Sequence, residues 1–214
     1  MKTYDEIIPE FLSDDDCRQA LMKPVLIEEH VFASNGHIAI KIPVSKLLKT
    51  YESNPNYPDI VSLYEKVEGL FQSPIIYKVE NISELLKQVP LTDVETQCTN
   101  CQGTGSIWSK DDSKEPETCK ICDGSGYVAT GKKEYDWQNH KIQIGLAYFN
   151  PNYVEKLLNV ATINDIKEVK HVYGTPMSKH LFIIDDLEII MMPIRLGIKE
   201  LPEYSVHKLT WRKR

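Results

Sequence analysis

The stretch Cys98-Thr-Asn-Cys101-Gln-Gly-Thr-Gly105 is repeated as Cys119-Lys-Ile-Cys122-Asp-Gly-Ser-Gly126, so the phrase Cys-x-x-Cys-x-Gly-x-Gly occurs twice in the chain. Two residues between cysteines let both thiolates of one turn reach the same metal ion. The glycines that follow allow a positive φ, which turns backbone amides back toward the sulfurs. Four cysteines are therefore predicted to form one closed metal site: Cys98, Cys101, Cys119 and Cys122.

A closed site of four thiolates is typical of structural Zn²⁺, and iron is the alternative because it also accepts four thiolates. Two disulfides are the other option. The metal-ligand spacing and an N-terminus without an apolar secretory signal instead favour reduced thiols in the cytoplasm. We expect one structural zinc ion per chain and a cytoplasmic location. Cys17 stands apart from the repeats and is expected to be an ordinary structural thiol.

The repeat resembles the cysteine-rich domain of DnaJ-type co-chaperones, which contains four such phrases and two zinc ions. Two phrases would correspond to one zinc module of that domain. We call each Cys-x-x-Cys-x-Gly-x-Gly phrase a knuckle. The chain has no His-Pro-Asp tripeptide like that of a J-domain, so chaperone activity is not implied by the two knuckles alone. The polar stretch 106–117 between the knuckles is expected to be a solvated hairpin arm. Metal binding can supply the folding free energy of such a module.

Length, composition and net charge limit the classes of protein to which the chain can belong. The chain has 214 residues, 42% hydrophobic and 26% charged, which fits one good-sized globular domain plus a small one. The net charge of -6 argues against a protein that coats nucleic acid non-specifically. No apolar stretch approaches the length of a membrane span, so no membrane partner is expected.

Hydrophobic periodicity predicts a mixed fold. An extended segment is expected at 20–28 and a basic, solvated tail at 206–214. Asn35-Gly36 and Asp185-Asp186 are predicted turns. The predicted helices are 4–12, 46–51, 60–71, 81–89 and 150–161, and the predicted strands are 30–33, 37–42, 75–79, 141–147, 169–173, 181–184 and 187–192.

Two flanking segments resemble parts of a bacterial sliding-clamp domain, the processivity clamp of DNA polymerase. Phe32-Ala-Ser-Asn-Gly-His-Ile-Ala39 is similar to the clamp phrase Ala-Thr-Asp-Gly-His-Arg-Leu-Ala. Ile142-Gln-Ile-Gly145 precedes a tyrosine-containing helix as in the clamp, and Met192-Pro-Ile-Arg-Leu196 is similar to the clamp ending Met-Pro-Met-Arg-Leu. Residues 1–43 and 141–196 carry this resemblance.

The resemblance implies an α+β fold in which a DNA-clamp-like domain of antiparallel sheet plus helices is interrupted by a small zinc-knuckle β-hairpin module. The clamp-like body would be residues 1–95 with 129–214, and the inserted zinc module would be 96–128. A clamp ring needs six such domains. One domain per chain would then require a hexamer, so we favour a fold that works without encircling DNA and leave the oligomeric state open.

In the clamp family these two segments line a pocket where polymerases and other partners dock a short peptide. Apolar side chains would form its floor, with His37 and Arg195 as a polar rim. Ile38 replaces an arginine of the family pattern, which halves the charge of that rim. The alternative is that 192–196 is an ordinary edge strand whose apolar side chains fill the core. The resemblance implies that these residues form the pocket: Gly36, His37, Ile38, Met192, Pro193, Ile194 and Arg195.

These observations predict a non-enzymatic, zinc-containing clamp-like binding or scaffold protein, linked to DNA replication or repair through peptide or nucleic-acid partners. No enzyme activity is expected, because the sequence has no Gly-x-Ser-x-Gly elbow and its glycine-rich stretches belong to the knuckles. The alternative is a DnaJ-like module that acts as a redox or unfolded-polypeptide-binding factor. Nucleic acid would be bound through Lys110, Lys114, Lys120, Trp108 and Trp211, a role weakened by acidic neighbours of the arm.

Overall fold

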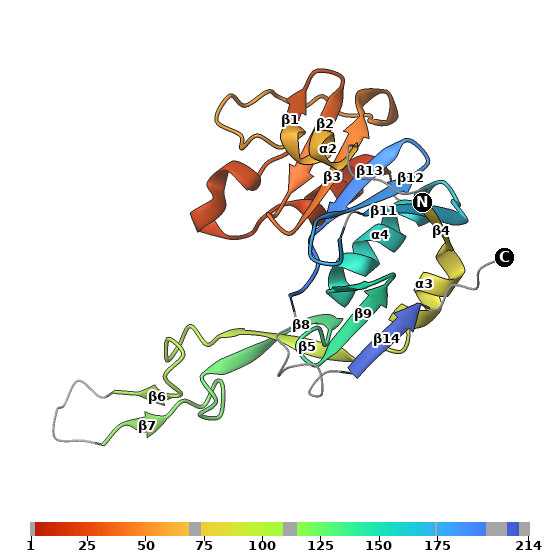
Figure 1. Cartoon of the computed structure of the whole chain (residues 1–214). Helices are drawn as coiled ribbons and strands as arrows, with labels where there is room; N and C mark the ends of the chain where they lie inside the picture. The colour runs from red at the N-terminus through yellow and green to blue at the C-terminus, as the bar shows by residue number, and fades with distance from the viewer. Residues whose placement is uncertain (1–2, 69–73, 109–114, 174, 196–204, 210–214) are drawn as a thin grey trace. The chain divides into compact units, whose positions relative to one another are not determined.

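The computed structural model describes residues 3–68, 74–108, 115–173, 175–195 and 205–209 (Figure 1). The chain divides into two compact units, one of Met1–Val89 with Trp137–Arg214 and one of Pro90–Asp136. The larger unit is α+β with a mainly antiparallel sheet, as the sequence predicts. The smaller unit contains the predicted range 96–128 and extends beyond it at both ends.

The larger unit is built on a seven-stranded sheet in the order β1-β2-β3-β13-β12-β11-β4 (Figure 1). Its strands are β1 (Val25–Ile27), β2 (His30–Ser34), β3 (Ile38–Pro43), β4 (Ile75–Lys78), β11 (Glu168–Tyr173), β12 (His180–Ile184) and β13 (Leu187–Met191). The central pairing joins β3 to β13 in antiparallel register, with Ile38 opposite Met191. Because β3 precedes the smaller unit in the sequence and β13 follows it, both flanks of the chain close into one sheet.

A second sheet of the larger unit has the order β10-β9-β14, with β9 at His140–Ile144, β10 at Ala147–Phe149 and β14 at Ser205–Leu209. The prediction of a single strand at 141–147 is wrong. Gly145 has a φ of 63°, and the chain turns there so that Ala147 pairs back with Ile144.

The C-terminal segment also differs from the prediction of a solvated tail. Residues 206–209 belong to β14, which pairs in parallel with β9. Residues 210–214 lie outside the described residues.

Helix α4 (Pro151–Ile163) begins as predicted from its cap. Asn150 Oδ1 accepts a hydrogen bond from the Asn152 amide at 2.9 Å, and Pro151 occupies the first turn. Among the described residues, none of the helices has both the length and the apolar character needed to cross a membrane. The other helices are α1 (Tyr4–Ile7), α2 (Val61–Glu68), α3 (Val79–Leu86) and the 3₁₀ helices η1 (Ile8–Phe11), η2 (Asp16–Leu21) and η3 (Val44–Lys46).

The helix predicted at 46–51 is wrong, because a buried carboxylate takes the backbone groups of this segment. Asp5 accepts hydrogen bonds from the amides of Leu48 and Lys49 at 2.8 and 3.1 Å and from the Tyr51 hydroxyl at 2.8 Å. A distant side chain therefore outweighs local helix propensity here.

Other predicted boundaries also differ from the structure, and the helix predicted at 81–89 is α3 at Val79–Leu86. Of the predicted helix 60–71, α2 covers Val61–Glu68, and 69–71 lie outside the described residues. An extended segment was expected from residue 20. Residues 20 and 21 instead form the end of η2, and the extended strand β1 begins at Val25.

Each face of the seven-stranded sheet has its own core, because successive side chains of a strand point to opposite faces. Ile60 and Tyr64 of the α2 region pack against Phe32, Ala39 and Ile190 on one face. Along the same strands, the neighbouring side chains point to the other face of the sheet and are buried there: Ile38, Ile40, Ile42, Phe182 and Ile189. Phe149 of β10 meets Phe182 edge-on at 5.6 Å between ring centroids, so the small sheet packs on this second face.

Two buried histidines lie in that second core. His171 Nε2 and His180 Nδ1 are 2.8 Å apart, and one ring donates to the other. Phe182 stacks on His171 at 4.4 Å between ring centroids. Burial lowers the pKa of His171 to about 3 and the pKa of His180 to about 4, so both rings are neutral in the folded protein.

We expect acid to destabilise the larger unit below pH 6.5. Histidines of the unfolded chain titrate near pH 6.5, whereas His171 and His180 of the folded chain stay neutral down to about pH 4. Between these pH values the unfolded chain binds more protons than the folded chain. The free energy of unfolding therefore falls as the pH falls. Moving from pH 7 to pH 5 should lower the free energy of unfolding by about 2 kcal/mol for each histidine, measured by urea denaturation. A His171→Phe, His180→Phe double variant should show a flatter profile, whereas exposed His37→Gln should not. A flat wild-type profile would contradict this account.

Candidate functional site

The two cysteine phrases fold into matching turns. In the first, the amides of Gly103 and Thr104 donate to the carbonyls of Cys98 and Cys101 at 3.2 and 3.1 Å. The equivalent bonds of the second turn are 3.1 and 2.9 Å long and run from Gly124 and Ser125 to Cys119 and Cys122. The repeated sequence therefore gives a repeated structure.

The two turns also bond to each other in a reciprocal way. The Cys98 amide donates to the Gly126 carbonyl at 2.8 Å, and the Cys119 amide donates to the Gly105 carbonyl at 2.9 Å. Gly105 has a φ of +73°, and a Cβ there would lie 2.2 Å from the Gly124 carbonyl oxygen. Glycine is required at this position because the two backbones touch.

The reciprocal turns bring the four predicted sulfurs together. Cys98 Sγ lies 3.9 Å from Cys119 Sγ, Cys101 Sγ lies 3.7 Å from Cys122 Sγ, and all four lie within 4.8 Å of one another. Sulfurs around a tetrahedral zinc ion with Zn–S bonds of about 2.3 Å are about 3.8 Å apart, so the spacing fits one central ion. The sulfurs are too far apart to be disulfide-bonded, and all four side chains are buried. These four cysteines can hold a metal ion.

Hydrogen-bond donors surround the sulfurs unevenly. Asn100 Nδ2 donates to Cys119 Sγ at 3.3 Å, and this bond lowers the pKa of the Cys119 thiol to about 6. The Gly126 amide donates to Cys122 Sγ at 3.3 Å, while burial raises the pKa of the Cys122 thiol. Such donors stabilise the negative charge of metal-bound thiolates. Ile121 stands at the position equivalent to Asn100, and its exposed, apolar side chain has no donor group to match the Asn100 amide.

The smaller unit has little apolar core of its own. Among the described residues, Val128 is the one apolar side chain that packs against the four cysteines. The ribbon of β5 (Leu91–Gln97) and β8 (Tyr127–Tyr135) is largely exposed, and the arm pairs β6 (Ser106–Ile107) with β7 (Glu117–Thr118). Two-stranded ribbons are marginally stable in water, so metal binding would supply folding free energy to this unit.

The second predicted site lies in the larger unit, where the turn at 34–38 meets the segment after β13. The His37 carbonyl accepts a hydrogen bond from the Met192 amide at 2.8 Å. The Ile194 amide in turn donates to the Tyr148 carbonyl of β10 at 2.7 Å. The structure therefore places two of the predicted pocket segments side by side, although they lie far apart in the sequence.

The turn itself is fixed by side-chain hydrogen bonds. Asn35 Oδ1 accepts from the amides of His37 and Ile38 at 2.9 and 3.0 Å. Ser34 Oγ accepts from the Gly36 amide and donates to the Ile38 carbonyl, both at 3.0 Å. These bonds are those of Asx- and Ser-type turns, and they hold His37 in one exposed position.

Tyr153 of α4 completes the surface, and the pocket residues predicted from the sequence did not include it. Its ring stacks on His37 at 6.4 Å between centroids with an interplanar angle of 16°. Burial raises the pKa of the Tyr153 hydroxyl, and Asn35 and Arg18 oppose that shift. The tyrosine-containing helix noted in the sequence was the available signal. The peptide pocket predicted from the sequence would lie here, so we call these residues the docking surface: His37, Tyr153, Met192, Pro193 and Ile194.

The remaining predicted pocket residues have different environments. Met192 and Arg195 are exposed, and Pro193 and Ile194 are half-buried. Gly36 is exposed beside His37, with a φ of 89°. Ile38 is buried within β3, so its side chain belongs to the core.

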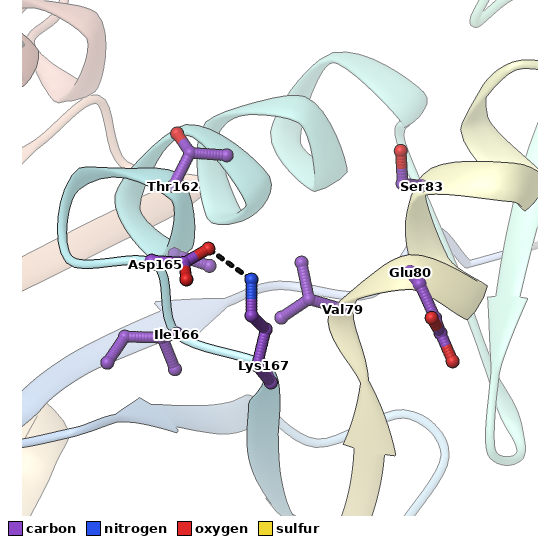
Figure 2. Close-up of a pocket in the computed structure, with 8 residues that line it drawn as sticks. Val79, Glu80, Ser83, Thr162, Asp165, Ile166 and Lys167 are labelled. Atoms are coloured by element: carbon purple, nitrogen blue, oxygen red, sulfur yellow. Dashed lines mark hydrogen bonds and ion pairs between the residues drawn. The ribbon is translucent and has the colours of Figure 1, made fainter. Parts of the chain in front are cut away.

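A separate groove of about 370 Å³ lies between α3 and the connection from α4 to β11 (Figure 2). Asp165 and Lys167 form an ion pair beside it, and Glu80 pairs with Lys78 at 3.4 Å. Its charged groups therefore satisfy one another. The four-cysteine cluster is the one group of metal-ligand side chains found in the described part of the chain.

Comparison with known proteins identifies the fold. No protein-family model and no curated protein sequence matches the chain. A DNA polymerase sliding clamp from Pseudomonas aeruginosa is similar in structure, with a TM-score of 0.50 and 12% identity over 91% of this chain and 66% of the clamp.

Two further solved structures give a similar picture. A sliding clamp from Bacillus subtilis has a TM-score of 0.48 and 14% identity, over 89% of this chain and 61% of that clamp. The DNA polymerase III beta subunit from Thermotoga maritima has a TM-score of 0.48 and 13% identity, over 89% of this chain and 63% of that subunit. The chain thus spans less than two thirds of the length of these proteins. At 12% identity, the likeness to the clamp from Pseudomonas aeruginosa shows the fold alone, which is clamp-like.

Replacing Gly105 by alanine should weaken metal binding by about 10- to 100-fold, because the new Cβ would collide with the Gly124 carbonyl and push the two knuckles apart. Gly131→Ala is the matched control, since Gly131 has a φ of +74° but nothing within 4 Å of an added Cβ. Affinity would be measured by competition with a chromophoric chelator. Equal losses in the two variants would show that backbone strain, not knuckle contact, matters.

Cys98→Ser and Cys122→Ser should each reduce bound metal from about one ion per chain toward zero, because each removes one of four thiolate ligands. Elemental analysis under reducing conditions would measure this, with Cys17→Ser as the control that keeps its metal. Thermal unfolding of the larger unit should change little, because that unit has its own core. Loss of its cooperative transition would mean that the larger unit does not fold independently.

Proposed function

We propose that this protein is a non-enzymatic clamp-like scaffold that docks a short peptide of a DNA replication or repair protein and carries one structural zinc ion. The observation that carries the proposal is the hydrogen bond between the Met192 amide and the His37 carbonyl. This bond joins the two segments that the sequence alone marks as similar to the clamp's peptide pocket.

The chemistry of the docking surface supports a peptide ligand. Met192, Pro193 and Ile194 offer apolar contacts in a segment that is only partly buried. The stacked rings of His37 and Tyr153 add a rigid wall with polar edges. Peptide sites combine such apolar contacts for affinity with a few fixed polar groups for orientation.

The metal centre supports a structural role. Four buried thiolates would fill a tetrahedral site and leave no position for a substrate. Zinc is the proposed ion, because it accepts this geometry without redox chemistry, and iron is the alternative. Reduced thiols of this kind fit a cytoplasmic location, which is part of the proposal.

A protein partner is favoured over nucleic acid. The net charge is -6, and the exposed Glu115 and Glu117 lie in the same arm as Trp108. A ring that encircles DNA needs a basic inner surface to meet the phosphates. We therefore propose a scaffold that does not encircle DNA.

The exposed apolar side chains of the smaller unit favour a second candidate function. Trp108, Ile121 and Tyr127 are 72%, 66% and 52% exposed. Exposed apolar side chains of this size are typical of protein-binding surfaces. A module that binds unfolded polypeptide, in keeping with the DnaJ-type resemblance, would use them.

Affinity capture from extracts of the source cells would test the proposal. Immobilised wild-type chain should retain replication or repair proteins, and Ile194→Asp should reduce them at least about fivefold, because a charge replaces an apolar contact. Met177→Asp, which alters another exposed apolar side chain, is the matched control. Retention of the same proteins by Ile194→Asp would refute peptide docking here. Proteins lost only with Cys98→Ser would instead support the polypeptide-binding module.

A further inference from the structure

Arg18 lies against the turn that presents His37. It sits at a kink inside η2, where its φ of -117° and ψ of 43° depart from helical values. Asp15 fixes the start of this segment, since its side chain accepts from the Cys17 amide at 2.9 Å and its carbonyl accepts from the Arg18 amide at 2.8 Å. From there, Arg18 Nη1 donates to the Asn35 carbonyl at 2.6 Å.

Gly36 makes this contact feasible. A Cβ at that position would lie 2.5 Å from Arg18 Nη1 and 3.4 Å from its Cζ. A side chain there would displace the guanidinium from the turn. The same glycine that shapes the turn around His37 therefore also seats Arg18 beside it.

The seated guanidinium keeps donors available. Its contacts within the described residues use Nη1, bonded to Asn35, and Nε, which lies 3.7 Å from Asp15 Oδ2. Nη2 has no partner among the described residues, and the side chain is 41% exposed. Arginine presents its N–H groups as a rigid planar fork that matches the two oxygens of a carboxylate.

We propose that Arg18 is a specificity-determining residue that binds a carboxylate next to the apolar side chains of a peptide on the docking surface. This inference rests on the proposed peptide docking. The guanidinium is seated on the Asn35 carbonyl, two residues before His37, whose own carbonyl bonds the Met192 amide. Asp14 and Asp15 are exposed beside Arg18, so a single negative charge suits the site better than a dianion.

A random octapeptide phage library, selected on the folded full-length chain, would test this inference. Peptides selected on the wild type should be enriched in Asp or Glu beside apolar residues. Arg18→Gln should select apolar peptides without that enrichment, whereas Lys23→Gln, which removes another exposed positive charge, should keep it. For the best peptide, changing its acid to the matching amide should weaken wild-type binding about fivefold and Arg18→Gln binding hardly at all.

The outcomes separate this inference from the proposed function. Peptides that need Ile194 but show no acidic enrichment would overturn the role of Arg18 and leave docking intact. A library that yields the same peptides on wild type and Ile194→Asp would overturn both. If Arg18→Gln disturbs the turn, Arg18→Lys provides the second test. Lysine keeps the positive charge but lacks the planar guanidinium, so Arg18→Lys should bind the acidic peptide with an affinity between those of the wild type and Arg18→Gln. Equal binding by Arg18→Lys and Arg18→Gln would overturn a charge-based role.

Discussion

The antiparallel pairing of β3 with β13 is the contact on which the rest of the larger unit depends. It joins residues from both sides of the inserted unit, with Ile38 opposite Met191. Its register decides which side chains enter each core, because a slip of one residue would exchange the faces of Ile40 and Lys41. The docking surface lies just beyond the ends of these two strands, where the Met192 amide continues the pairing by bonding to the His37 carbonyl.

The smaller unit follows a different physical principle. Its strands bury little apolar area, and its compactness comes from two reciprocal turns whose glycine backbones touch. Both turns direct their sulfurs to one point, so the free energy of binding a metal ion there would take the place of an apolar core. A unit held together in this way can be inserted between two strands of another fold, because its stability does not require the core of its host.

Within the larger unit, polar groups are placed by contacts between distant segments. Asp5 holds the segment around Leu48, and Arg18 is seated on the turn of Asn35 and Gly36. The paired histidines lie deep in the second core, where burial keeps them neutral. A buried carboxylate such as Asp5 is costly unless it is hydrogen-bonded, so its contacts also fix the position of the segment around Leu48.

The sequence by itself determined the four cysteines that can hold a metal ion, the α+β class and the two segments that resemble a clamp, because these depend on short spacings and periodic patterns. The tertiary structure decided the rest. The helix expected at 46–51 was displaced by Asp5, and the strand expected at 141–147 was divided at Gly145. Tyr153 was stacked on His37, and Arg18 was bonded to the Asn35 carbonyl. Each of these outcomes depends on partners distant in sequence or on backbone geometry, and local propensity contains no information about which distant group will arrive.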